Sequence, residues 1–448
     1  MPTPTVLQTI PSMPRYPIIG NVGALRRDRL AFFQAVFDTC GAVGVFHFGS
    51  KPVLMVADPA LIQTLLVDHS PALQKTTRLR TLLQTVVGNS LLTLEGADHH
   101  IQRRLLAPVF QPRTIAAHTA LIRNETQHWL AAWPRTPHDV YASMQDLSLR
   151  LNHRLLFGSD LATQPQIVAA WTAVTAMVNH AMTQVVTPPR WVPTLRHRRF
   201  HAARRTLDAA LLPLIQLRRH EPTPHDLISH VLEAARGEGV SLTDADIRDQ
   251  VMAFFIAGHE PLAAALTWAW YVLATEPDIT QQLRYTIDHA PDETPPALLT
   301  QTLAEVLRLY PPVYVFTRRV IAPIDLPGLG VLPSGLTLGF SPFIIQRNPQ
   351  WYPNPTQFDP SRFAPEAAAA RPRLSYIPFG IGAHQCIGMH LALQQLTTVM
   401  QTVLQAGIPR LVDATPVGFK PRIVLEPDRA LLGLSQETQK FGGSIKEY

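Results

Sequence analysis

Three kinds of segment follow one another along the chain, and they differ in how apolar and polar positions alternate. Near the N-terminus, apolar residues at helical spacing predict a helix over residues 30–40. Alternation then predicts a strand pair, Val43–Phe48 and 52–56, around a turn at Gly49-Ser50. From residue 59 to about 290 the pattern is mostly helical. Breaks are expected at residues 88–90, 134–139, 188–193 and 221–224, where glycine, proline and polar residues gather.

After Thr300 the pattern changes to short elements separated by prolines. A helix over 301–309 stops at Pro311-Pro312, and short strands with turns run to about residue 342. A coil over 348–378 leads to the segment 379–388, and a last helix begins near Ile387.

No repeat and no linker divides the chain, so we expect one domain over residues 1–448, mainly α-helical with a small β lobe. The β lobe should comprise about 15–60 and 312–342. The helical lobe should comprise about 60–310 and 343–410.

One stretch, residues 251–274, is apolar and long enough to resemble a membrane span. His259, Glu260 and Pro261 lie near its middle, and ionised groups there would be costly in lipid. A long helix buried in the core explains the stretch better, so we expect no integral membrane anchor.

Composition indicates a globular protein with a sizeable core, because hydrophobic residues make up 46% of the 448 positions and charged residues 16%. Lysine and arginine number 39 against 33 acidic residues, without dense basic runs, so we expect no nucleic-acid partner. The excess could favour an acidic protein partner or reflect only a soluble basic surface. With two cysteines, Cys40 and Cys386, and no secretory leader, we expect a cytoplasmic protein.

The segment 379–388, Phe-Gly-Ile-Gly-Ala-His-Gln-Cys-Ile-Gly, carries the chemistry. A cysteine that enters a helix N-terminus lies where free N–H groups and the helix dipole stabilise a thiolate. Gly382 and Gly388 would let the backbone approach something flat and large, and Phe379 could shield the sulfur from water. Taken alone, a cysteine among glycines is more often structural.

Two further motifs add to this segment. Glu305 and Arg308 lie three residues apart on one predicted helix face, and Arg362 follows in the proline-rich coil. We expect these three side chains to form a cluster that fixes the scaffold behind the thiolate.

Together these motifs resemble the cytochrome P450 family. The four defining positions of its cysteine-loop signature are filled by Phe379, Gly382, Cys386 and Gly388. Its Glu-x-x-Arg pair and the arginine of its following meander are matched as well, in family order over essentially the whole chain. The resemblance implies the cytochrome P450 fold, a heme b cofactor (iron protoporphyrin IX), and Cys386 as the thiolate ligand of the iron.

The resemblance also implies the residues that hold the cofactor. His99 and Arg103, one helical turn apart, resemble the pair that reaches the heme propionates. Arg318 and His384 resemble the remaining propionate partners. The alternative for His99 is an exposed helix residue without a role, and its neighbour His100 is expected to be solvated.

At the oxygen-activation site the chain departs from the family, which usually has Ala/Gly-Gly-x-Asp/Glu-Thr. This chain has Ala257, Gly258, His259, Glu260 and Pro261, so the acid is kept and the alcohol that helps deliver protons is lost. Proline inside a helix costs about 3 kcal/mol and leaves the Ala257 carbonyl without its bond, so this carbonyl could hold a water. Either Glu260, ordered water or a substrate hydroxyl relays the protons, or the substitution is neutral in an ordinary hydroxylase.

The resemblance implies a monomeric monooxygenase that oxidises a hydrophobic small molecule, such as a terpenoid, a fatty acid or a specialised metabolite. Its electrons should come from a separate ferredoxin with its reductase, or from a flavodoxin. Substrate contacts are expected from residues 73–92, 171–193, 313–316 and 431–432 and from Phe255.

Two alternatives stay open. The missing alcohol suggests a peroxide-driven peroxygenase, although retention of Glu260 argues against it. A non-catalytic heme-binding sensor is the other.

Overall fold

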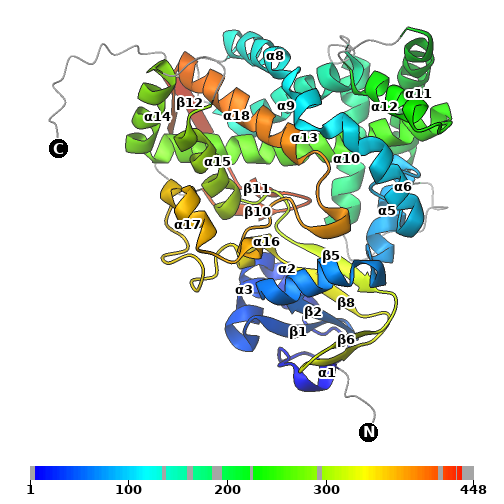
Figure 1. Cartoon of the computed structure of the whole chain (residues 1–448), viewed down its shortest axis with the longest axis vertical. Coiled ribbons are helices and arrows are strands. Elements are labelled where there is room, and N and C mark those ends of the chain that lie inside the picture. The colour runs from blue at the N-terminus through cyan, green and yellow to red at the C-terminus, as the bar shows by residue number, and fades with distance from the viewer. Residues whose placement is uncertain are drawn as a thin grey trace, which may run out of the picture.

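A computed structural model describes residues 6–133, 138–158, 165–183, 194–221, 226–289, 295–411, 417–429 and 431–435. Most of its helices gather on one side of a small β lobe, and α1 (Val6–Thr9) lies at the free end of that lobe (Figure 1). The fold is therefore mainly α-helical with a small β region, as the sequence predicts. The breaks predicted at 134–139, 188–193 and 221–224 fall wholly or partly outside the described residues.

The predicted strand pair starts the largest sheet. β1 (Val43–Phe48) and β2 (Lys51–Val56) are antiparallel, and β2 runs parallel to β8 (Thr337–Phe340). β5 (Phe316–Val320) and β3 (Leu73–Gln74) complete the order β1-β2-β8-β5-β3. Strand β3 lies inside the segment predicted to be helical, and its two residues are too few to show an alternating pattern.

The remaining strands form two hairpins and a small sheet. These are β6 (Ile324–Leu326) with β7 (Gly330–Leu332), β10 (Phe419–Pro421) with β11 (Leu425–Pro427), and β12 (Leu431–Ser435) between β4 (His138–Asp139) and β9 (Ile408–Leu411). The sequence did not predict the β10–β11 hairpin, whose strands are short and each contain a proline.

The long helices are α3 (Arg29–Cys40), α5 (Thr77–Val87), α6 (Gly96–Leu106), α8 (Thr119–Ala131), α9 (Val140–Phe157), α10 (Pro165–Thr183), α11 (Leu195–His220), α12 (Leu227–Gly237), α13 (Asp244–Thr275), α14 (Pro277–His289), α15 (Ala297–Leu309) and α18 (Met389–Ala406). The short ones are α1 (Val6–Thr9), α2 (Val22–Arg27), α4 (Pro59–Gln63), α7 (Pro112–Ala116), α16 (Pro342–Ile345) and α17 (Pro365–Ala369). Helix α17 lies in the segment predicted to be coil.

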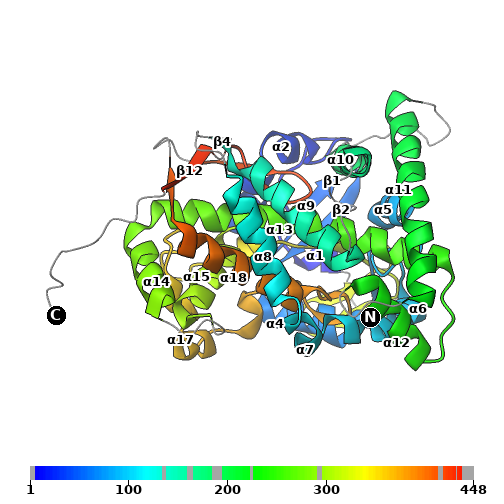
Figure 2. The same ribbon diagram turned by 90° about the horizontal axis from the view of Figure 1, so that it is seen from above.

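Helix α13 is the central helix of the helical lobe, and α8 and α9 cross above it (Figure 2). A capping box begins it, because Thr243 accepts a bond from the Asp246 N–H and the Asp246 carboxylate accepts one from the Thr243 N–H. The helix continues through Pro261. Its length and composition would allow it to cross a membrane, but 72% of its apolar window is buried inside the protein. It is thus a core helix, as the polar residues near its middle suggested.

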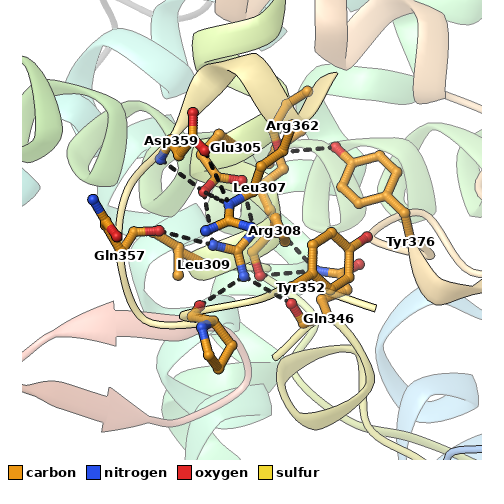
Figure 3. A network of polar contacts seen from close by, with 12 residues as sticks. Glu305, Leu307, Arg308, Leu309, Gln346, Tyr352, Gln357, Asp359, Arg362 and Tyr376 are labelled. Carbon is orange, nitrogen blue, oxygen red and sulfur yellow. Dashed lines mark hydrogen bonds and ion pairs between the residues drawn. The ribbon is translucent and has the colours of Figure 1, made fainter. Parts of the chain in front are cut away.

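The predicted cluster of Glu305, Arg308 and Arg362 is confirmed (Figure 3). Arg308 donates to both carboxylate oxygens of Glu305 at 2.6 and 2.7 Å, and both side chains are fully buried. Arg362 Nε lies 3.6 Å from Glu305 Oε1. Two guanidinium groups therefore neutralise one carboxylate where water cannot compete.

The same cluster binds the coil that follows α16. Arg308 also donates to the carbonyls of Gln346, Pro355 and Gln357, and the Asp359 N–H donates to Glu305. A single pair of side chains on α15 thus supplies the partners that backbone groups over residues 346–359 would otherwise lack.

Gln346 and Tyr376 extend this hydrogen-bond network towards the cysteine loop. The Gln346 amide donates to the carbonyls of Leu307 and Arg308 and accepts from the Ile377 N–H at 2.9 Å. The Tyr376 hydroxyl donates to a carbonyl of α15 at 3.1 Å. The chain just before the cysteine loop is therefore fixed to the same helix.

We expect Glu305→Ala to destabilise the protein by about 3–5 kcal/mol, because two buried guanidinium groups would lose their carboxylate. Urea unfolding monitored by circular dichroism measures this loss. The matched control is Glu366→Ala on α17, where the side chain is exposed and little change is expected. Equal stability of the two variants would show that the cluster adds little to folding.

Candidate active site

Cys386 lies in a short loop that is fixed on both sides. Its N–H donates to the Phe379 carbonyl at 2.9 Å, and Arg103 of α6 donates to the Gln385 carbonyl at 2.7 Å. The residue keeps an exposed surface, yet nearby protein atoms desolvate the thiol and raise its pKa. The Gly388 N–H and Arg103 oppose this rise. A further positive partner, such as a metal ion, would make the thiolate the stable form.

The loop glycines differ in what surrounds them. Gly382 has φ +73°, and a Cβ there would lie 1.9 Å from the Leu66 carbonyl oxygen. Its close approach is thus to protein backbone, whereas the sequence suggested a large flat group. A Cβ on Gly388, the N-cap of α18, would meet only Phe110, at 3.9 Å.

One face of α13 is open near this loop. Ala257 is exposed and Phe254 and Pro261 are partly exposed, although most of the helix is buried. The three share one face because residues three and four apart lie together on a helix. The Phe254 ring packs 5.0 Å from the ring of Phe110, the residue nearest Gly388. The open face and the cysteine loop therefore meet at Phe110.

Gly258 belongs to the contact between helices. A Cβ at this position would lie 3.1 Å from the side-chain oxygen of Asn152 on α9, so a larger residue would push the two helices apart.

Basic side chains from four segments gather beside the cysteine loop. Lys75 follows β3, Arg103 lies on α6, Arg318 lies on β5, and His384 precedes the cysteine by two residues. One carboxylate, Glu95, lies 3.5 Å from Lys75 Nζ and 3.3 Å from His384 Nε2. Burial alone would raise the pKa of Glu95, but His384 and Lys75 outweigh it and lower the pKa to about 2. Two arginines, and a lysine whose pKa burial lowers to about 8, thus gather near a single negative charge.

Arg318 shows the imbalance most clearly. The residue is 9% exposed, and its guanidinium donates to the Thr317 carbonyl and lies 5.1 Å from the Phe316 ring centroid. Among the described residues no carboxylate forms an ion pair with it. Burial lowers its pKa to about 10, with Glu95 opposing the change. A buried cation without a counter-ion is costly, so the arrangement favours an anionic ligand.

His99 is buried at 3% exposure, so the alternative of an exposed helix residue is wrong. Its ring lies 4.3 Å from the ring of His384. Burial, together with His384 and Lys75, lowers the pKa of His99 to about 3, so it is a neutral hydrogen-bonding group. His100 is exposed, as expected.

Glu260 lies at the side of the open face of α13. It follows Ala257 by three residues, is 4% exposed, and accepts a 3.0 Å bond from the Tyr141 hydroxyl of α9. Burial raises its pKa, while Tyr141 and Arg422 oppose the rise. On its other side it lines a cavity of about 580 Å³ between α9, α10 and α13, together with His259 and Arg422.

Four charged or polar residues around these sites could not be foreseen. They are Lys75, Glu95, Tyr141 and Glu426. Each lies in a segment without a motif, and its importance follows from the residue that the fold places beside it.

Comparison with known proteins decides the family. The family model described as "Cytochrome P450" matches residues 10–406. The chain belongs to the cytochrome P450 family.

The relatives of the chain and its fold agree with this family assignment. Cyclooctatin synthase of Streptomyces melanosporofaciens is 31% identical over 91% of this chain and 92% of the relative. Pentalenene oxygenase of Streptomyces avermitilis is 29% identical over 94% and 96%. The structure of retinoic acid-bound cyanobacterial CYP120A1 matches with a TM-score of 0.82 and 23% identity, over 96% of this chain and 99% of that one. The protein is thus a cytochrome P450 monooxygenase with a heme-thiolate centre.

The residues of this cytochrome P450 fit the heme of its family. Cys386 offers a sulfur ligand in a loop with an exposed surface, and the open face of α13 adjoins that loop. The excess of cations beside the loop suits the two carboxylates that heme carries. The fit rests on the chemistry of these donors, above all on the unpaired Arg318.

A pH effect on stability follows from Glu426, whose pKa burial raises from 4.5 to about 7 despite Arg422. The fold therefore favours the protonated carboxyl. This contribution to stability is fully present below about pH 4.5 and is lost as pH rises through about 7. Glu426→Gln cannot ionise. Its melting temperature should therefore increase relative to that of the wild type as the pH rises from about 4.5 to about 7, and the difference should stay constant above that range.

Thermal unfolding of both proteins across this range measures the difference. The exposed control, Glu366→Gln, should keep a constant offset from the wild type. A constant offset for Glu426→Gln as well would contradict the raised pKa.

Proposed function

We propose that the chain binds heme b with the Cys386 sulfur as iron ligand, and oxidises a hydrophobic small molecule. The unpaired, buried Arg318 beside the cysteine loop is the observation that carries this proposal. Arg103, His384 and the neutral His99, which packs against His384, would join Arg318 around the propionates. Arg103 would also hold the loop through the Gln385 carbonyl. Phe379 would cover the sulfur, and Gly382 and Gly388 would shape the loop.

When bound, the heme supplies activation of molecular oxygen with electrons from a separate donor, a ferredoxin with its reductase or a flavodoxin. The protein's own residues hold the cofactor, exclude water and move protons. The basic surface, with 39 lysines and arginines against 33 acidic residues, supports an acidic donor protein. The low cysteine count supports work in a reducing cytoplasm, and we propose a monomer.

Proton delivery would depend on Glu260 because Pro261 has no hydroxyl. Pro261 also lacks an N–H, so the Ala257 carbonyl cannot receive its usual helical bond. This carbonyl lies on the exposed part of α13 and can hold a water molecule within reach of the helix flank that carries Glu260. Gly258 keeps this part of α13 close to α9.

A terpenoid is the substrate class that the relatives favour over a fatty acid. The names cyclooctatin synthase, pentalenene oxygenase and cyclooctat-9-en-7-ol 5-monooxygenase belong to relatives of 29–31% identity. Of the substrate contacts expected from residues 171–193, residues 184–193 lie outside the described residues, as do the side chains of 431–432. Titration with cyclic terpenoids should shift the Soret band, and a shift with fatty acids alone would overturn the choice.

Cofactor binding has a direct spectroscopic test. The reduced, carbon-monoxide-bound protein should absorb near the wavelength that names the family, and Cys386→Ser should abolish this band because the thiolate is lost. The matched control is Cys40→Ser, a buried cysteine on α3. Cys40→Ser should keep the band, and a band that survives in Cys386→Ser would refute the ligand assignment.

Glu260→Gln should slow reductant-driven turnover by roughly 10²–10⁴-fold, because it removes a proton donor. Peroxide-driven turnover should change far less, since peroxide brings its own protons. Product and consumed reductant are measured together. Pro261→Thr should change their ratio only modestly. A several-fold gain in that variant would indicate that the wild type lacks an efficient relay, which favours the peroxygenase alternative.

A further inference from the structure

Three polar side chains from three separate elements meet at one side of α13. Glu260 lies on α13, Tyr141 at the start of α9, and Glu426 on β11. Both carboxyl groups belong to residues that are 4% exposed. Two acids so near one another are costly to bury unless they share protons or a counter-charge.

The fold fixes this meeting point. The Trp268 indole of α13 donates to the Leu425 carbonyl of β11 at 2.7 Å, and the Leu425 N–H donates to the Pro312 carbonyl at 2.9 Å. The residue next to Glu426 is therefore held on both sides by parts of the chain far away in sequence. The position of Glu426 against α13 is built into the packing of the hairpin.

The Tyr141 hydroxyl is the link between the two acids. It donates to Glu260 at 3.0 Å, and the Glu426 carboxyl lies close enough for the two groups to affect each other's pKa. A tyrosine hydroxyl has one proton to donate, so it can serve only one carboxylate at a time. It can accept a bond from the other acid only if that acid carries a proton.

We propose that Glu426, Tyr141 and Glu260 form a proton relay from the β10–β11 hairpin to α13. The proposal rests on the proton-delivery role proposed above for Glu260. In one transfer the Glu426 O–H bond breaks and its proton passes to the Tyr141 oxygen, while the Tyr141 O–H bond breaks and its proton passes to Glu260. The net transfer is one proton from Glu426 to Glu260, nothing is oxidised or reduced, and Tyr141 ends as neutral as it began.

The surrounding charges suit this direction. Burial raises the pKa of Glu426 to about 7, Glu260 adds to the rise, and Arg422 and Lys420 oppose it. Burial and both acids raise the pKa of Tyr141, so its hydroxyl stays protonated. Near neutral pH Glu426 can thus be protonated or ionised, as a relay requires.

The relay can be refilled from outside. Arg422 Nη1 lies 3.6 Å from Glu426, and its side chain is 46% exposed. Arg422 and Glu260 also line the cavity of about 580 Å³ described above. The polar residues Gln145, Asp146 and Thr172 are among its other lining residues, so it suits water. The relay therefore connects solvent at the hairpin to the side of α13 next to Ala257.

Infrared spectra of the heme-loaded protein test the relay without turnover. Spectra taken across neutral pH should show a protonated carboxyl band that titrates, and Glu426→Gln should remove it. Tyr141→Phe should shift this band, because the carboxyl loses its partner. Matched controls are Glu276→Gln, at the C-terminal end of α13, and Tyr285→Phe, whose side chain is exposed on α14. Both controls should keep the wild-type titrating band.

Reductant-driven turnover provides the second readout. Glu426→Gln and Tyr141→Phe should each lower product formed per reductant by about 10-fold or more, with peroxide-driven turnover kept. The relay is overturned if either variant matches the controls in both readouts. If only Glu260→Gln loses turnover, Glu260 keeps its proposed role and the relay fails. If Glu260→Gln also matches the wild type, both the relay and that role fail.

Discussion

The buried carboxylate of Glu305 is the constraint on which the catalytic half of the fold depends. A fully buried charge is tolerated only when every lone pair is satisfied, and here two guanidinium groups and the Asp359 N–H do so. Because Arg308 then binds carbonyls over residues 346–357, the proline-rich coil has one low-energy path. That path ends at the cysteine loop, so the position of the Cys386 sulfur is set by a charge cluster well before it in the chain.

The sequence predicts this part well because its signals are local. The cysteine loop and the Glu305–Arg308 pair each lie within one turn or loop, so spacing alone indicates their geometry. Lys75 and Glu95 carry no such signal, since their roles arise when the two-residue strand β3 pairs with β5 and brings Lys75 towards Arg318. Gly382 shows the converse. It fills the motif position of the family signature, but its neighbour, the Leu66 carbonyl, lies in the π-helical segment Thr64–Asp68, and no local pattern indicated that this segment would lie against the loop.

Two charged sites of opposite sign lie at different parts of the helical lobe. Beside the cysteine loop, cations outnumber carboxylates, which prepares that site for an anion from outside the chain. At the α9 side of α13, one carboxyl group accepts from the Tyr141 hydroxyl and a second is paired with the exposed Arg422. A bound anion would relieve the first imbalance, and a proton would relieve the second. On the proposals above, cofactor binding and proton supply depend on separate groups, so a substitution in one group should leave the other intact.

Pro261 affects both the backbone of the open face of α13 and the supply of protons to that face. The helix continues through it, although a proline in a helix interior costs about 3 kcal/mol and removes a backbone bond. A threonine there would add a hydroxyl on the open face and restore the bond to Ala257. Because Pro261 provides neither the hydroxyl nor the N–H, the open face has the Ala257 carbonyl without its usual helical partner. A carbonyl oxygen accepts hydrogen bonds but cannot donate one. On the role proposed for Glu260, a proton would reach this face from the side of α13, where Tyr141 holds the Glu260 carboxyl from outside the helix.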